Sequence, residues 1–252
     1  MSRRRRDFSM AITHTFRQAA DAFLTLLYPP HCAACGANLE RGQHLCAACA
    51  GEAERIEQPF CKTCSQPFYG AIEQEFTCSN CSDRSFHFEC AVTRHRSRGI
   101  VRDLLIRFKY HGEFYLRHPL GTWLAEGLAD PRIAGEKFDC IVPVPLHPTR
   151  ERDRHFNQAR SLAKTLEHSA GAPVFDCLKR VRKTPTQTRF DRKARMENLR
   201  NAFQMRNNRS VQGKAVLLVD DVFTTGSTVD ECARVLKKSG ARSVRVLTVA
   251  RG

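Results

Sequence analysis

The feature that most constrains this chain is residues 216–228, where an apolar run meets two carboxylates and a hydroxyl-rich loop. Four large apolar residues at 216–219 predict a strand buried on both faces, which is typical of the parallel sheet in an α/β domain. Asp220 and Asp221 follow at the carboxyl end of that strand, where open α/β sheets bind their ligands. The stretch therefore predicts an α/β domain with a ligand site at this edge of the sheet.

The loop after the two carboxylates is suited to an anion, because it offers the hydroxyls of Thr224, Thr225, Ser227 and Thr228. Gly226 lets the backbone approach a bound group closely. A helix predicted over residues 229–238, with a Thr or Ser cap, adds the N–H groups of its first turn. Carboxylates accept hydrogen bonds from a diol and repel phosphate, so a phosphorylated sugar fits the whole stretch. A core strand with an ordinary capped helix, or a metal-binding Asp pair, are the alternatives.

Position by position, this stretch resembles the phosphoribosyl-pyrophosphate signature of type I phosphoribosyltransferases. The resemblance implies their fold, a parallel sheet flanked by helices. It also implies that Asp220 and Asp221 are catalytic and hold the ribose hydroxyls, while residues 224–228 wrap the 5′-phosphate. Mg²⁺ would then arrive on the pyrophosphate of the substrate.

Two basic segments are expected at the same site. A strand over residues 138–144 leads into a basic loop, whose Arg150 and Arg154 suit a pyrophosphate because each guanidinium can grip two oxygens. The polar stretch 182–201 is predicted to be a flap that closes over the phosphates and excludes water. Its cations are further candidates for catalysis: Arg192, Lys193 and Arg195. A solvated loop and a surface insertion are the respective alternatives.

Cysteine usage predicts a second, metal-binding module. Eight of the 12 cysteines form four C-x-x-C pairs: Cys32/Cys35, Cys46/Cys49, Cys61/Cys64 and Cys78/Cys81. Two such pairs complete a tetrahedral Cys₄ site without an open position, so two structural zinc ions are expected. Consecutive pairing is the simplest arrangement, and interleaved pairing fits the spacing as well. A redox role for a single pair is the alternative. The other four are expected to be small buried apolar side chains: Cys90, Cys140, Cys177 and Cys232.

A chain of 252 residues has room for one α/β domain and a smaller module. We expect a basic tail and amphipathic helix over residues 1–30, a Cys-rich double zinc ribbon over 31–85, and the α/β domain over 86–252. The ribbon has few large aliphatic residues and cannot bury a core unaided. Removal of the metal should therefore unfold it and leave the α/β domain standing.

The net charge and the hydropathy pattern limit which partners and which cellular location we expect. Lys and Arg number 41 against 26 Asp and Glu, a formal charge of +15, which attracts polyanions without saying which one. No run of about 18 apolar residues and no usable signal peptide are visible, so we expect a cytoplasmic protein without a membrane span.

Four features together resemble the ComF family of phosphoribosyltransferase-like proteins. They are the cysteine pairs after Leu27-Tyr28-Pro29-Pro30, the segment 108–112, the Pro-Val-Pro-Leu strand with residues 154–158, and the stretch from Gln187 to Phe203. The resemblance implies that Asn157, Gln158 and Gln187 contact the substrate. Family members are associated with DNA uptake in natural competence, which implies single-stranded DNA and competence-machinery proteins as partners. His155 stands where the family usually has Gly, at a position where Gly reaches positive φ more cheaply.

Two functions fit these sequence features. One is phosphoribosyl transfer to an acceptor that the sequence does not reveal. The other is non-catalytic binding of single-stranded DNA, in which the sugar-phosphate site serves as a ligand sensor or as a grip on the DNA backbone. A degenerate fold that only binds other proteins is a third possibility, and the intact Asp220-Asp221 pair argues against it.

Overall fold

The computed structural model describes residues 29–70, 76–183 and 199–252, which form two compact units. One unit ends at Gly51, and the other runs from Glu52 to Gly252. The predicted double zinc ribbon therefore has cysteines in both units, and its predicted bounds stay a prediction. The helix expected over residues 8–27 lies outside the described residues.

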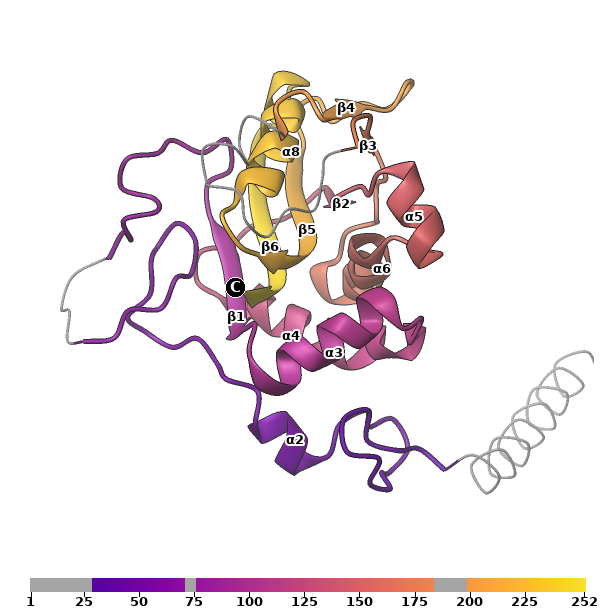
Figure 1. Cartoon of the computed structure of the whole chain (residues 1–252). Coiled ribbons are helices and arrows are strands. Elements are labelled where there is room, and N and C mark those ends of the chain that lie inside the picture. The colour runs from indigo at the N-terminus through magenta and orange to yellow at the C-terminus, as the bar shows by residue number, and fades with distance from the viewer. Residues whose placement is uncertain (1–28, 71–75, 184–198) are drawn as a thin grey trace, which may run out of the picture. The chain divides into compact units, whose positions relative to one another are not determined.

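A four-stranded parallel sheet forms the centre of the second unit (Figure 1). Its strand order is β1 (Ala91–Arg96), β6 (Ser243–Arg251), β5 (Ala215–Phe223) and β2 (Cys140–Pro143). All three neighbouring pairs are parallel. The first five residues of β5 are buried, as the apolar run predicts for a strand covered on both faces of the sheet. The α/β class is thus confirmed.

Helices flank this sheet. The face that carries Val216 and Leu218 belongs to one core cluster with apolar residues of α8 (Ser227–Lys238). Helix α6 (Gln158–Ala170) contacts β2 and β5, and α4 (Arg117–Glu126) contacts β1 and β6. Figure 1 shows α4 and α6 grouped with α3 and away from α8.

A small antiparallel pair of strands stands apart from the main sheet. It consists of β3 (Leu178–Arg180) and β4 (Phe203–Met205). The predicted flap connects these two strands, so it is anchored at both ends. Its residues 184–198 lie outside the described residues, and with them the predicted site residues Gln187, Arg192, Lys193 and Arg195.

The predicted basic loop after β2 is wrong, because residues Pro148–Arg154 form helix α5. Pro148 lies in the first turn, where its missing N–H costs nothing, and His147 accepts a hydrogen bond from the Thr149 amide. Arg152 and Arg154 lie in the last turn, where cations suit the helix dipole. These local features outweigh the polar composition that suggested a loop.

The four cysteines outside the C-x-x-C pairs are buried, as expected: Cys90, Cys140, Cys177 and Cys232. Within residues 29–70, 76–183 and 199–252, every helix is too short or too polar to cross a lipid bilayer.

Candidate functional site

The carboxylate pair lies inside β5 rather than after it, since the strand continues to Phe223. Asp221 forms an ion pair with Lys109 at the end of α3 (Gly99–Tyr110), with Nζ 3.0 Å from Oδ2. Burial, together with the Asp221 carboxylate, raises the pKa of Asp220 to about 7. Near neutral pH Asp220 therefore carries a proton for part of the time, and in that form its carboxyl group can donate to a hydroxyl group as well as accept from one.

Arg180 of β3 lies within electrostatic reach of Asp220 and of Arg150, and Arg150 lies near Arg154 on the same helix, α5. Burial and the charge of Arg154 lower the pKa of Arg150, while burial and the charge of Arg150 lower the pKa of Arg180. Arg154 donates to the Tyr110 hydroxyl over 3.0 Å, and its guanidinium lies 4.7 Å from the centre of that ring. Repulsion among fixed cations is relieved by a bound anion, so this cluster suits phosphate groups.

The hydroxyl-rich loop turns at Gly226, whose φ is +77°. A Cβ atom there would lie 2.6 Å from the Phe223 ring, so both space and conformation favour glycine. Helix α8 begins at Ser227, two residues earlier than predicted, and Gly226 is its N-cap. The predicted Thr or Ser cap is therefore wrong. Gly226 has no side chain that could cap the first turn. The Ser227 amide donates to Thr225 Oγ1 over 3.5 Å, a long contact that a bound anion can replace, so the N–H groups of this turn suit an anion.

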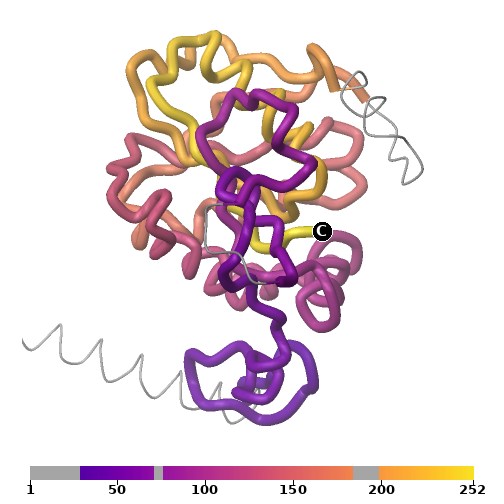
Figure 2. Tube along the Cα trace, turned by 90° about the vertical axis from the view of Figure 1, so that its left-hand side faces the viewer, coloured from indigo at the N-terminus to yellow at the C-terminus, as the bar shows by residue number. Residues whose placement is uncertain are grey.

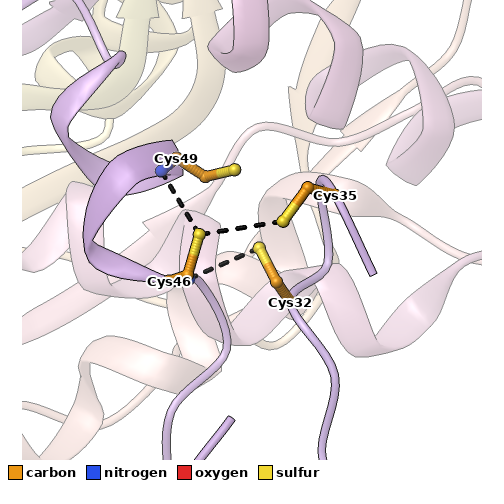
Figure 3. A group of neighbouring side chains, drawn as sticks. All are labelled: Cys32, Cys35, Cys46 and Cys49. Atoms are coloured by element: carbon orange, nitrogen blue, oxygen red, sulfur yellow. Dashed lines mark hydrogen bonds between the residues drawn. The ribbon is translucent and has the colours of Figure 1, made fainter. Parts of the chain in front are cut away.

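The first group of cysteines belongs to the unit that ends at Gly51 (Figure 3). Its four sulfur atoms lie within 4.8 Å of one another: those of Cys32, Cys35, Cys46 and Cys49. The Cys35 and Cys46 sulfurs are 3.7 Å apart, and the Cys46 amide donates to the Cys32 sulfur over 3.4 Å. Burial alone would raise the pKa of Cys32, but backbone donors, among them Cys35 and Cys46, lower it to about 6.

The second group belongs to the other unit and is enclosed in its hydrophobic core. It consists of Cys61, Cys64, Cys78 and Cys81, all buried and also within 4.8 Å of one another. The Cys64 and Cys78 sulfurs are 3.6 Å apart. Hydrogen bonds from the Cys64 and Cys81 thiols lower the pKa of Cys61, which favours the thiolate form.

Both groups fit a tetrahedral zinc ion. Four sulfurs at about 2.3 Å from a zinc ion lie about 3.8 Å from one another, close to the 3.7 and 3.6 Å found. Consecutive pairing of the C-x-x-C pairs is therefore the arrangement adopted, and the interleaved alternative is not. All four ligands of each site come from protein, so a bound ion would be structural rather than catalytic.

Two family models match this chain. A double zinc ribbon domain matches residues 23–82, and a phosphoribosyl transferase domain matches residues 156–252. The DNA utilization protein YhgH of Salmonella typhimurium is 33% identical over 210 residues, which is 82% of this chain and 90% of that protein. Competence protein F of Haemophilus influenzae is 29% identical over 225 residues, 87% of this chain and 96% of that protein.

The chain belongs to the ComF family. Solved structures show more distant likeness. The glutamine phosphoribosylpyrophosphate amidotransferase of B. subtilis is 20% identical, covers 56% of this chain and 30% of its own, and has a TM-score of 0.37. The adenine phosphoribosyltransferase of Rhodothermus marinus is 17% identical and has a TM-score of 0.36. The match covers 56% of this chain and 70% of that protein.

Two residues of this ComF-family chain that were predicted to contact the substrate make structural hydrogen bonds within the protein. Buried Asn157 caps α6 by accepting from the Arg160 amide over 3.1 Å, and its amide group donates to the Val144 carbonyl, also over 3.1 Å. Buried Gln158 accepts from Arg154 over 3.2 Å. Asn157 thus fixes the end of β2, and Gln158 orients an arginine. Direct contact of either with a substrate stays a prediction.

His155 takes the left-handed conformation that the family's usual Gly would take easily, with φ +64°. A left-handed residue other than Gly costs about 1–2 kcal/mol. The expected shape of the α5–α6 connection is therefore kept despite the substitution, and the strain is the cost of keeping it.

Lys109 and Arg180 were missed as site residues. Each lies far from Asp220 and Asp221 in sequence, and only the tertiary structure brings them together. Lys109 belongs to the segment 108–112 that carried part of the family resemblance, which was the one signal available. Arg180 was visible only as one charge in a basic stretch.

Proposed function

We propose that this ComF-family chain binds phosphoribosyl pyrophosphate, or a closely related sugar phosphate, at the carboxyl ends of β5 and β2. One observation carries the proposal: a carboxylate pair and a helix N-terminus with glycine at the N-cap lie on one strand–loop–helix unit, and Arg180, which lies near Asp220, joins them to the arginines of α5. Asp220 and Asp221 would hold the ribose hydroxyls. Residues 224–228 would bind the 5′-phosphate, and Arg150 and Arg154 the pyrophosphate.

The reaction class that follows is phosphoribosyl transfer. The bond between the anomeric carbon and pyrophosphate would break as an acceptor bonds to that carbon. The residues gathered here would act mainly by position and charge. Arg180 and Lys109 join the arginines that neutralise the departing pyrophosphate, and Mg²⁺ would accompany it. The flap residues Arg192, Lys193 and Arg195 remain predicted contributors.

Calorimetric titration tests the binding site. Parent protein with two zinc ions should bind phosphoribosyl pyrophosphate with Mg²⁺ more tightly than it binds ribose 5-phosphate or pyrophosphate alone. Asp221→Asn should weaken binding by about 1–3 kcal/mol, the range for partners left unpaired. Asp103→Asn, an exposed carboxylate on α3, is the matched control and should bind as the parent does. Equal affinity of the parent and the Asp221 variant would contradict the proposal.

A second candidate function is non-catalytic binding of single-stranded DNA. The names of the related proteins refer to competence and DNA utilization, and a surface with an exposed aromatic ring and basic side chains supports this candidate. A hollow of about 780 Å³ is lined by Phe114 and by the cations Arg117 and Lys164. Phe114 is 41% exposed. Exposed rings beside cations allow bases to stack while phosphates are neutralised.

Fluorescence anisotropy with a labelled oligonucleotide tests this candidate. Affinity should fall log-linearly with salt, and Phe114→Ala should weaken binding by about 1–3 kcal/mol. The matched control is Tyr69→Ala, which removes another exposed ring of the same unit. Competition with phosphoribosyl pyrophosphate would indicate a shared site. A lack of salt-sensitive binding near physiological ionic strength would remove this candidate.

A further inference from the structure

The segment that follows Cys81 is attached to the loop and helix proposed to hold the 5′-phosphate. Arg84 donates from Nη1 to the Thr225 carbonyl over 3.1 Å. The His87 amide donates to Asp230 Oδ1 over 2.7 Å, and the ring Nδ1 lies 3.1 Å from the same oxygen. In Figure 2 this segment runs beside the C-terminal part of the chain. Two anchors thus join the second cysteine group to the start of α8.

Arg84 fixes the orientation of a particular peptide group. The Thr225 carbonyl and the Gly226 N–H belong to one trans peptide unit and point in opposite directions. The next peptide is held as well, because the Gly226 carbonyl accepts from the Asp230 amide over 2.8 Å in the first turn of α8. With both carbonyls occupied, the N–H groups of Gly226 and Ser227 face away from these partners. The Ser227 amide donates to Thr225 Oγ1 over 3.5 Å, so the Thr225 side chain also holds this turn.

Arg84 is itself held in place by the cysteine group. Its amide donates to the Cys81 carbonyl over 3.3 Å, and its guanidinium lies 4.3 Å from the centre of the Phe86 ring. Phe86 stacks on Phe88 at 4.7 Å, and Phe88 meets the Phe223 ring edge-on at 6.2 Å. Residues in contact with one another therefore connect Cys81 to the phosphate-binding loop, and some of these contacts are between apolar rings.

We infer that the second Cys₄ group orients the phosphate-binding loop through Arg84, so that occupation of this group by zinc raises the affinity for the sugar phosphate. Arg84 is a positioning residue, since it holds the loop from behind. A closed thiolate site offers no open coordination position, and its contribution here is to fix residues 82–87. This inference rests on the proposed function for its ligand.

The physical basis is preorganisation. When Cys81 and Arg84 are fixed, the loop N–H groups are oriented before the ligand arrives. When they are released, ordering of the loop becomes part of the binding step and weakens it. The first Cys₄ group belongs to the other compact unit, so it serves as an internal control of the same chemistry.

Arg84 variants test the inference without disturbing a metal ligand. Arg84→Ala should weaken phosphoribosyl pyrophosphate binding about tenfold, the effect of losing one hydrogen bond from a charged donor. It should also speed hydrogen exchange at the amides of residues 225–229. Arg84→Lys should restore part of both effects. Arg102→Ala, an exposed arginine on α3, is the matched control and should change neither.

Metal-site variants extend the test. Cys81→Ser should weaken binding and loosen the loop as Arg84→Ala does, whereas Cys35→Ser should leave both unchanged. If the parent does not bind the sugar phosphate, the proposed function fails, but hydrogen exchange still decides whether the coupling exists. Unchanged exchange at residues 225–229 in Arg84→Ala would overturn the inference, and faster exchange would support it.

Discussion

The two Cys₄ groups share a motif and a sulfur geometry but differ in their surroundings. In the first group Cys35 is exposed and Cys46 is half-buried, and the neighbouring helix α2 (Ala47–Gly51) has only five residues. In the second group all four cysteines are buried in one core cluster with Val216 and Leu218 of β5. Four cysteines in the first unit would thus mainly hold a small fold together around a metal. In the second unit the same four-cysteine motif is one part of a larger hydrophobic core.

This difference revises the expectation that metal removal unfolds one Cys-rich module and spares the α/β domain. The first group has few apolar neighbours among the described residues of its unit, so we expect a bound metal to supply most of its stability. The second group packs in one core cluster with the sheet, so removal of its metal should also destabilise the α/β domain. The presence of the same motif therefore does not predict how much of the chain unfolds when its metal is removed.

The largest expected effect is on unfolding of the second unit. Cys64→Ser should lower its free energy of unfolding by about 3 kcal/mol or more, since it removes a metal and leaves buried thiols without their partner. Cys35→Ser should change it by less than about 0.5 kcal/mol. Urea unfolding followed by the fluorescence of Trp123, the only tryptophan and a buried residue of α4, reports on this unit alone. Equal losses would remove the contrast between the two groups.

The second largest expected effect is a difference in how the stability of the two units depends on pH. Thiolate metal sites weaken as pH falls, whereas Asp220 contributes with the opposite sign. Its pKa is raised from 3.8 to about 7, so the folded state binds more protons between these values and this contribution to stability falls as pH rises. Asp220→Asn should remove about 1–3 kcal/mol of that pH dependence. Urea titrations at several pH values check this, and parallel curves for parent and variant would contradict it.

Metal release should follow exposure. A colorimetric chelator should take zinc from the first group at least about tenfold faster than from the second, because the second must open the core before a chelator can reach it. Variants that lack one group assign the two kinetic phases. Release at similar rates would mean that the buried group opens without disturbing the sheet.

The smallest expected effect is the reciprocal of the coupling through Arg84. If zinc in the second group improves sugar-phosphate binding, the ligand must strengthen zinc binding by the same factor, about tenfold or less. Saturating phosphoribosyl pyrophosphate should therefore slow chelation of the second zinc and leave the first unchanged. Equal protection of both metals would indicate a general effect of the ligand on the whole chain.

Local patterns predicted much of this fold. The apolar run before Asp220 predicted the buried strand β5, whose first five residues are buried. The C-x-x-C spacing identified the eight metal-ligating cysteines, while their division into two groups of four came from the structure. In each case neighbouring residues alone determine the outcome, so the physical cause is visible in a short window.

Contacts between distant segments could not be predicted. The Lys109–Asp221 ion pair and the Arg84–Thr225 hydrogen bond join residues more than a hundred positions apart. Burial of the second cysteine group depends on strands that follow it in the chain. The start of α8 was misplaced because a hydroxyl-rich loop suggests a Ser or Thr cap, while the turn required Gly226.

The Lys109–Asp221 ion pair has a consequence for the order in which ligands arrive. A tethered ammonium beside a carboxylate acts as a resident counter-ion, and Asp220 near neutral pH carries a proton for part of the time. A free divalent cation would have to displace both, while an anionic complex of that cation can draw Lys109 toward its own phosphates. We therefore expect the metal to enter on the ligand rather than ahead of it, so that the empty site discriminates against bare cations.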